Sequence, residues 1–224
     1  MAEHDEWRAA LKDSAHERHK AAWAFFGGEL RGNALARLLD GQREAATAWA
    51  LELLQDEALA IDGSLGDGFA PINAARLLGE WKVTDAFPHL LKIVLDADES
   101  EDPSMLWDAS VRALSEMPVE VLPALFEAAQ RVDEDQQVTL LSIMADVCGG
   151  QADDALFDWM IKVFERKRSD WELEYLVEQL LQANPERAIP YVEGFITRRR
   201  LSPRTLDIFK RRIQETRDEL DKKS

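Results

Sequence analysis

The segment Asp-Ala-Phe-Pro-His-Leu-Leu at residues 85–91 decides the fold, because three similar segments follow it along the chain. These are Glu-Val-Leu-Pro-Ala-Leu-Phe at 120–126, Asp-Ala-Leu-Phe-Asp-Trp-Met at 154–160 and Arg-Ala-Ile-Pro-Tyr-Val-Glu at 187–193. Their fourth residues lie 35, 34 and 33 positions apart, and three of the four are proline. A nearly constant period of this length is the signature of a repeat protein.

Each repeat is predicted to be a pair of helices, since apolar residues recur at spacings of three and four and strand patterns are absent. First helices are expected at about 71–80, 104–116, 136–148 and 170–183, and the quoted segments form the second helices. Gly149-Gly150 predicts a left-handed cap that ends a first helix. Five prolines are expected in first turns, where the missing N–H needs no partner: Pro71, Pro103, Pro118, Pro185 and Pro203.

A helix pair of about 34 residues cannot bury its own apolar face, so neighbouring pairs must stack. The sequence therefore predicts an all-α protein that forms one domain over 1–224, with four repeats at 70–200. Residues 1–69 are N-terminal helices or divergent repeats; 4–26 and 29–60 are expected to form two or three helices. Inter-repeat contacts should bury a set of large side chains: Leu78, Trp81, Leu90, Trp107, Leu114, Leu125, Met144 and Trp159.

The last segment, 201–224, is predicted to be a C-terminal capping helix, because its apolar residues form a single seam. The same seam would suit a short coiled-coil dimer, so a monomer or a weak dimer is expected.

The repeats resemble a known family. Ile72–Glu80 followed by Ala86–Leu91 is similar to the short bacterial HEAT-like repeat, also found in the phycobilin-lyase group, with Ala-Ala-x-x-Leu-Gly and then Ala-x-Pro-x-Leu. The resemblance covers about 70–200 and departs from the pattern at Phe157, which replaces a proline. It implies an α-solenoid, a right-handed superhelix of antiparallel helix pairs whose second helices line a concave face. A period of 34 also fits tetratricopeptide repeats, but their Trp, Leu-Gly and Tyr pattern is missing.

The charge is strongly acidic. The 224 residues contain 27 Lys and Arg against 43 Asp and Glu, a net charge of −16, and 56–158 hold 22 acidic but only five basic residues. Such a surface repels phosphate backbones and attracts basic partners, although acidic residues also serve solubility. We therefore expect no nucleic-acid partner. The lack of a leader and of a span of about 20 apolar residues predicts a cytoplasmic protein with no membrane contact.

Candidate chemistry is weak throughout. Cys148 has no histidine after residue 89 to activate it and is expected to be a small buried apolar group. His16 and His19, with Asp13 one turn earlier, are expected to form an exposed polar face of a helix. The acidic run 96–102 has Glu101 where a calcium loop needs glycine, and 63–68 is expected to be a glycine-rich turn. The sequence predicts no catalytic residue, metal or cofactor, and no enzyme.

The second helices predict a partner-binding surface. In 85–91 the apolar residues share one face and leave His89 on the opposite face. The same lane continues through the later second helices, and it defines the candidate site: His89, Glu120, Glu127, Asp158 and Tyr191. We expect a non-enzymatic scaffold whose concave acidic face binds another protein through a basic segment. Alternatives are a lyase-like or chaperone-like protein of the phycobilin-lyase group and a HEAT-like DNA glycosylase, against which the shortage of Lys and Arg argues.

Overall fold

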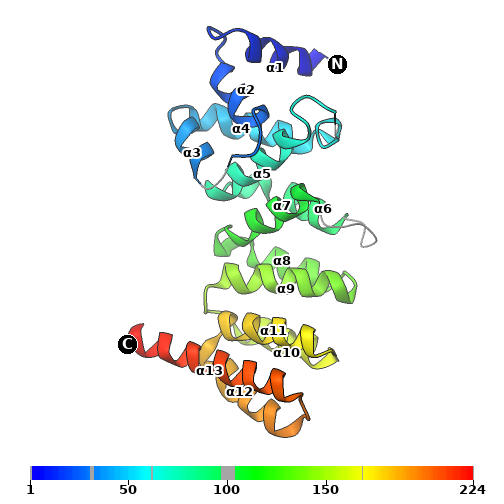
Figure 1. Ribbon diagram of the computed structural model, residues 1–224, viewed down its shortest axis with the longest axis vertical. Helices are drawn as coiled ribbons and strands as arrows, with labels where there is room; N and C mark the ends of the chain where they lie inside the picture. Colours follow the sequence, from blue (N-terminus) through cyan, green and yellow to red (C-terminus); the bar gives the residue numbers. More distant parts are fainter. Residues whose placement is uncertain (1, 31–32, 62, 97–103, 168, 224) are drawn as a thin grey trace. The chain divides into compact units, whose positions relative to one another are not determined.

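The computed structural model describes residues 2–30, 33–61, 63–96, 104–167 and 169–223. Over these residues its regular structure consists of thirteen α-helices and four short 3-10 helices, without a strand (Figure 1). The prediction of an all-α protein is confirmed. None of the described helices has the length and apolar character needed to cross a lipid bilayer.

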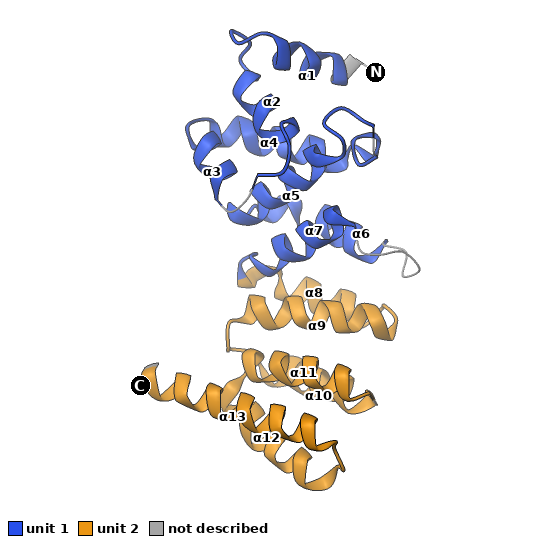
Figure 2. Ribbon diagram, in the orientation of Figure 1, with its two compact units in different colours: residues 1–118 blue, residues 119–224 orange. Residues whose placement is uncertain are grey.

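The chain divides into two compact units, residues 1–118 and 119–224 (Figure 2). The boundary lies between α7 (Met105–Ser115) and α8 (Leu122–Ala129), the two predicted helices of the second repeat. The expectation of one domain over the whole chain stays a prediction, and each unit is described by itself.

Unit 1 is built around α5 (Phe69–Glu80), which contacts four other helices of the unit. These are α2 (His19–Phe26), α3 (Ala34–Leu39), α4 (Arg43–Gln55) and α7, while α1 (Ala2–Lys12) packs on α2 and α6 (Phe87–Leu95) packs on α7. Short 3-10 helices span Asp40–Gln42, Glu57–Leu59 and Thr84–Ala86. The amide of Asn73, fully buried in α5, donates to the carbonyls of Phe25 and Gly28 at 3.0 and 2.8 Å, which ties the segment after α2 to this core.

The described residues of the N-terminal region form four α-helices, so the expectation of two or three was wrong. A turn at 13–18 interrupts the predicted helix 4–26. The Asp13 carboxylate accepts from the Ala15 amide at 2.9 Å, and His16 Nδ1 accepts from the Arg18 amide at 3.1 Å. Short polar side chains that bond nearby backbone groups in this way compete with the helix.

Unit 2 is built around α11 (Asp170–Ala183), which contacts α9, α10, α12 and α13. In Figure 1, α9 (Glu134–Cys148) and α11 lie side by side, and α13 (Pro203–Lys223) packs on α11 and on α12 (Pro185–Arg198). α10 (Asp154–Arg166) contacts both α9 and α11, and a 3-10 helix, Val119–Val121, precedes α8. The capping seam of α13 is buried at Phe209 and Ile213.

Most of the predicted helix ends and turns are confirmed. Gly149 adopts a φ of 55° and ends α9, and residues 63–68 form a turn with positive φ at all three glycines and at Asp67. Pro185 and Pro203 begin α12 and α13. Pro118 does not begin an α-helix, since a 3-10 turn follows it and Pro123 lies in the first turn of α8. Pro103 and most of the acidic run 96–102 lie outside the described residues.

The core predictions hold with two exceptions. Trp81 is buried, and five further side chains are essentially inaccessible: Leu78, Leu90, Leu114, Leu125 and Met144. Trp159 is only half-buried because Leu156, Phe157 and Met160 of the same helix occupy the core positions. Trp107 is also half-buried, and its indole N–H donates to the carbonyl of Val94 at 3.3 Å.

Candidate functional site

The predicted binding residues lie on four of the expected elements. His89 is half-buried on α6 of unit 1. In unit 2, Glu120 lies in the 3-10 turn before α8, Glu127 on α8 and Asp158 on α10, and all three are exposed, whereas Tyr191 on α12 is half-buried. We call Glu120, Glu127, Asp158 and Tyr191 the second-helix lane of unit 2.

Ion pairs already connect two helices of this lane. Arg187 on α12 reaches both Asp154 and Asp158 on α10, with N–O distances of 2.8 Å each, and its guanidinium lies 4.6 Å from the centre of the Phe157 ring. The basic fourth repeat therefore neutralises acidic groups of the third. A partner's cation would have to compete with Arg187 for Asp158.

The other lane residues differ in whether their polar groups already have a partner within the chain. The Tyr191 hydroxyl donates to Glu165 at 2.9 Å, and burial together with this carboxylate raises the pKa of Tyr191, so the phenol stays neutral at physiological pH. Glu127 pairs with Arg131 one turn along α8. Glu120 is exposed and has no ion-pair partner among the described residues. Glu120 is thus the open carboxylate of the lane, and Glu127 is held only by an exposed ion pair within its own helix.

A half-buried aromatic contact joins α8 and α10 beside the lane. Phe126 and Trp159 meet edge to face, with ring centres 5.7 Å apart and ring planes at 74°. Both residues follow the sequence repeat, since each lies in the second-helix segment of its own pair. Trp159 serves this contact and not the deep core, which accounts for its exposure.

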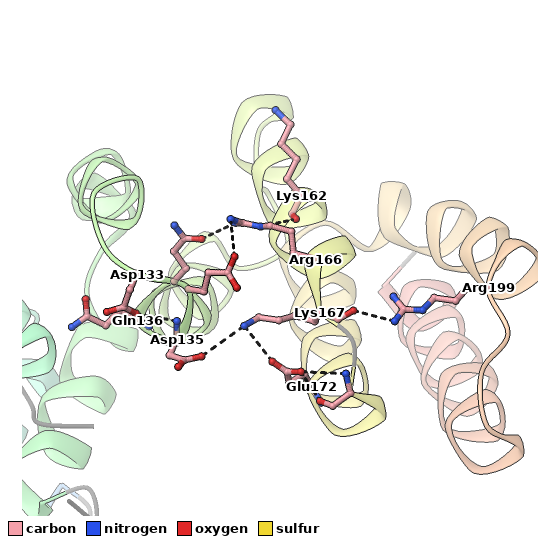
Figure 3. A network of polar contacts seen from close by, with 11 residues as sticks. Asp133, Asp135, Gln136, Lys162, Arg166, Lys167, Glu172 and Arg199 are labelled. Carbon is pink, nitrogen blue, oxygen red and sulfur yellow. Dashed lines mark hydrogen bonds and ion pairs between the residues drawn. The ribbon is translucent and has the colours of Figure 1, made fainter. Parts of the chain in front are cut away.

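A buried lysine organises the polar network at the start of α11 (Figure 3). Lys167 follows α10, its side chain is 7% exposed, and its ammonium group lies 3.2 Å from Glu172 and 3.8 Å from Asp135. Its carbonyl accepts from Arg199 at 3.1 Å. The lysine thus links α9, α11 and the end of α12. Because it is paired on both sides, it acts as a structural cross-link.

The same turn contains a capping box. The Ser169 hydroxyl accepts from the Glu172 amide at 3.2 Å, and the Glu172 carboxylate accepts from the Ser169 amide at 3.3 Å. The Ser169 hydroxyl and Lys167 lower the pKa of Glu172. The spacing Ser-x-x-Glu could have indicated this cap from the sequence.

An exposed aromatic pair lies on α11 and was not singled out by sequence reasoning. Trp171 is 72% exposed and Tyr175 is 38% exposed, and their rings are nearly parallel, at 8°, with centres 6.4 Å apart. They stand one helical turn apart, so the signal was available as two aromatic residues at a spacing of four.

Unit 1 contains an open cleft of about 660 Å³ between α5, α7 and the segment near residue 30. Its two arginines are bound within the wall: Arg76 to Glu29 at 2.9 Å and Arg112 to Glu116 at 3.1 Å. Both arginines of the cleft are therefore already paired with carboxylates of the chain itself.

The weaker chemical candidates of the sequence have structural roles. Cys148 is buried as predicted, its thiol lies 3.4 Å from the carbonyl of Ala145, and burial raises its pKa. The polar helix face expected at His16 and His19 is wrong: His16 lies in a turn, and the half-buried His19 donates from Nδ1 to the carbonyl of Ala10 at 2.7 Å. Over the residues that the structure describes, no cluster of three His, Cys, Asp or Glu could hold a metal ion.

Comparison with protein-family models, with curated proteins and with solved structures finds no match for this chain.

Proposed function

We propose that this chain is a non-enzymatic scaffold that binds another protein through a basic segment of that partner. One observation carries the proposal: successive second helices of unit 2 present exposed carboxylates, at Glu120, Glu127, Asp154 and Asp158. The net charge of −16 adds a long-range field that attracts basic partners and opposes phosphate backbones.

The buried polar groups support a binding role. Five polar or charged residues are buried among those described, and each of them bonds a neighbouring helix or its own helix: Asn73, Ser110, Lys167, Gln179 and Thr205. Groups committed to holding helices together are not free to act on a substrate.

The proposal includes the architecture that the sequence predicts, a HEAT-like α-solenoid with a right-handed superhelix. Three local features support it. First helices lie against first helices within each unit, α5 against α7 and α9 against α11. The second helices α6 and α8 both follow a 3-10 turn and have a proline in their first turn. Gly79, in the Leu-Gly of the first-helix pattern, lies where α5 closely approaches α7.

The test measures binding of a fluorescently labelled synthetic peptide of mixed Lys and Arg residues to the full chain. Changing both Glu120 and Glu127 to Lys should weaken binding about tenfold and flatten its salt dependence, because Glu120 is open and Glu127 forms only an exposed pair within its own helix. Asp158 is left unchanged, since a lysine there would break an ion pair that joins α10 to α12 and so could disturb the fold.

The matched control changes Glu219 and Asp221 to Lys, which alters the net charge equally at two exposed positions of α13. Its effect should stay below about twofold. Equal losses in the two double variants would assign binding to net charge alone and contradict the proposed surface. If the wild-type chain shows no binding of the peptide at about 0.15 M salt, the proposed function is contradicted.

A further inference from the structure

The aromatic pair Trp171–Tyr175 is the most exposed large apolar feature of α11. Other aromatic rings of unit 2 lie in its core, as Phe157, Phe164 and Phe209 do. Large aromatic side chains that remain accessible and adjacent mark interaction surfaces more often than isolated exposed residues do. The pair is therefore a candidate contact surface in its own right.

A carboxylate precedes each ring in the sequence, Asp170 before Trp171 and Glu174 before Tyr175. The Thr205 hydroxyl donates to Glu174 at 2.8 Å, and the hydroxyls of Ser202 and Thr205 lower the pKa of Asp170. Within the described part of the chain neither carboxylate forms an ion pair, and α11 contains four acidic residues and no basic one. Two electron-rich rings thus lie on a helix whose charged residues are all acidic, and Arg199 is the nearby cation that acts on Asp170.

Elsewhere in the molecule, the cation that forms cation–π contacts with tryptophan is arginine. The Arg18 guanidinium lies 5.3 Å from the Trp7 ring centre and 5.2 Å from that of Trp49, and Arg43 lies 5.1 Å from that of Trp81. These three rings are buried, and each is covered by a guanidinium of the chain itself. Among the described residues Trp171 has no such cation above it.

The surface around the pair is held in place. α11 packs against α9 and α13. Its first turn is fixed by the Ser169–Glu172 capping box and by the ion pair between Lys167 and Glu172. A ligand would meet rings and carboxylates that need little reordering, and this lowers the entropic cost of binding.

We infer that Trp171, Tyr175, Asp170 and Glu174 bind an arginine side chain of the partner, an assignment that rests on the proposed function because the arginine belongs to the partner's basic segment. Arginine is favoured over lysine, since its flat guanidinium stacks on an aromatic face while its N–H groups donate to a carboxylate in a fork.

The experiment titrates the full ¹⁵N-labelled chain with hexa-arginine and, separately, with hexa-lysine, and follows the indole N–H signals. The Trp171 signal should move with hexa-arginine, which should bind at least threefold tighter than hexa-lysine. Changing both Trp171 and Tyr175 to Ala should weaken hexa-arginine binding at least fivefold and remove the preference for arginine. Asp170→Asn with Glu174→Gln should weaken binding while the rings remain.

Trp23→Ala is the matched control, because Trp23 is 56% exposed but lies in unit 1 beside His19. It should leave binding unchanged. Wild-type affinity in the Trp171/Tyr175 variant, or equal affinity for the two peptides, would overturn the assignment. If the Trp171/Tyr175 variant keeps wild-type affinity but changing Glu120 and Glu127 to Lys still abolishes peptide binding, the proposed function stands and the arginine site fails. Concentration-dependent self-association that the Trp171/Tyr175 variant loses would assign the pair to a second copy and also overturn it.

Discussion

At the residue scale, two leucines test the repeat register. Leu90 and Leu125 occupy equivalent positions of consecutive second-helix segments, and both side chains are fully buried, one in each unit. Truncation of such a side chain loses its transfer free energy and leaves a cavity. Leu90→Ala and Leu125→Ala should each lower the free energy of unfolding by about 2–5 kcal/mol, measured by urea denaturation.

Leu38→Ala is the control for this pair, since the Leu38 side chain is 36% exposed. Its loss should stay below about 1 kcal/mol because little apolar area returns to water. Losses under about 0.5 kcal/mol at both Leu90 and Leu125 would show that the two leucines do not support the core.

Burial at single residues was predictable where the period of the helix decides it, as it is for Leu90 and for Cys148. Side-chain partners were not predictable in the same way. The pairing of Arg187 with Asp158 depends on the rotation of α12 and α10 about their own axes, which a few degrees would change. The exposure of Trp159 depends on competition with Phe157 and Met160 for the core, and apolar character alone does not rank these residues.

At the element scale, two helical glycines make opposite predictions. A Cβ at Gly79 would lie 2.6 Å from the Cα and 2.8 Å from the Cβ of Ala113 on α7, whereas a Cβ at Gly194 would meet only the end of the Arg198 side chain, at 3.5 Å. Gly79→Ala should therefore lower the free energy of unfolding by about 1–3 kcal/mol, because α5 and α7 must separate. Gly194→Ala should raise it by about 0.5–1 kcal/mol through helix propensity.

Urea denaturation of both glycine variants beside the wild-type chain gives the comparison. If Gly79→Ala stabilised the protein as much as Gly194→Ala, the close approach of α5 and α7 would be contradicted. The comparison is matched because both substitutions add the same methyl group to a glycine within an α-helix.

Helix boundaries were predictable where a local residue enforces them. Pro185, Pro203 and the Gly149 cap act through backbone geometry that is the same in any fold, so their effect could be anticipated. The turn at 13–18 was missed, because the Asp13 and His16 side chains bond backbone amides there and the apolar spacing continues through it. The Trp171–Tyr175 pair was missed for a related reason, since spacing shows a shared helix face but not whether that face is covered.

At the scale of the whole molecule, charge is the property that the sequence states most directly. Residues 1–118 carry 22 acidic and 11 basic residues, and residues 119–224 carry 21 and 16. The acidic surface was therefore predictable, as were the elements that present the second-helix lane. The pair of Glu127 and Arg131 was also predictable from its spacing of four, but the pairs of Arg187 were not, because they depend on how α12 packs on α10.

Salt should act on this molecule with opposite signs in two measurements. With a net charge of −16 the folded chain repels itself, and the ion pairs of its surface, exposed as most of them are, each contribute only about 0–1 kcal/mol. Raising the salt from about 10 mM to about 150 mM shortens the screening length from about 30 Å to about 8 Å. The free energy of unfolding should then rise by on the order of 1 kcal/mol, since net repulsion outweighs the pairs. Over the same range, affinity for a basic peptide should fall several-fold.

Urea is the suitable denaturant for this measurement because guanidinium chloride is itself a salt. A free energy of unfolding that falls with salt would mean that the local ion pairs dominate the net repulsion.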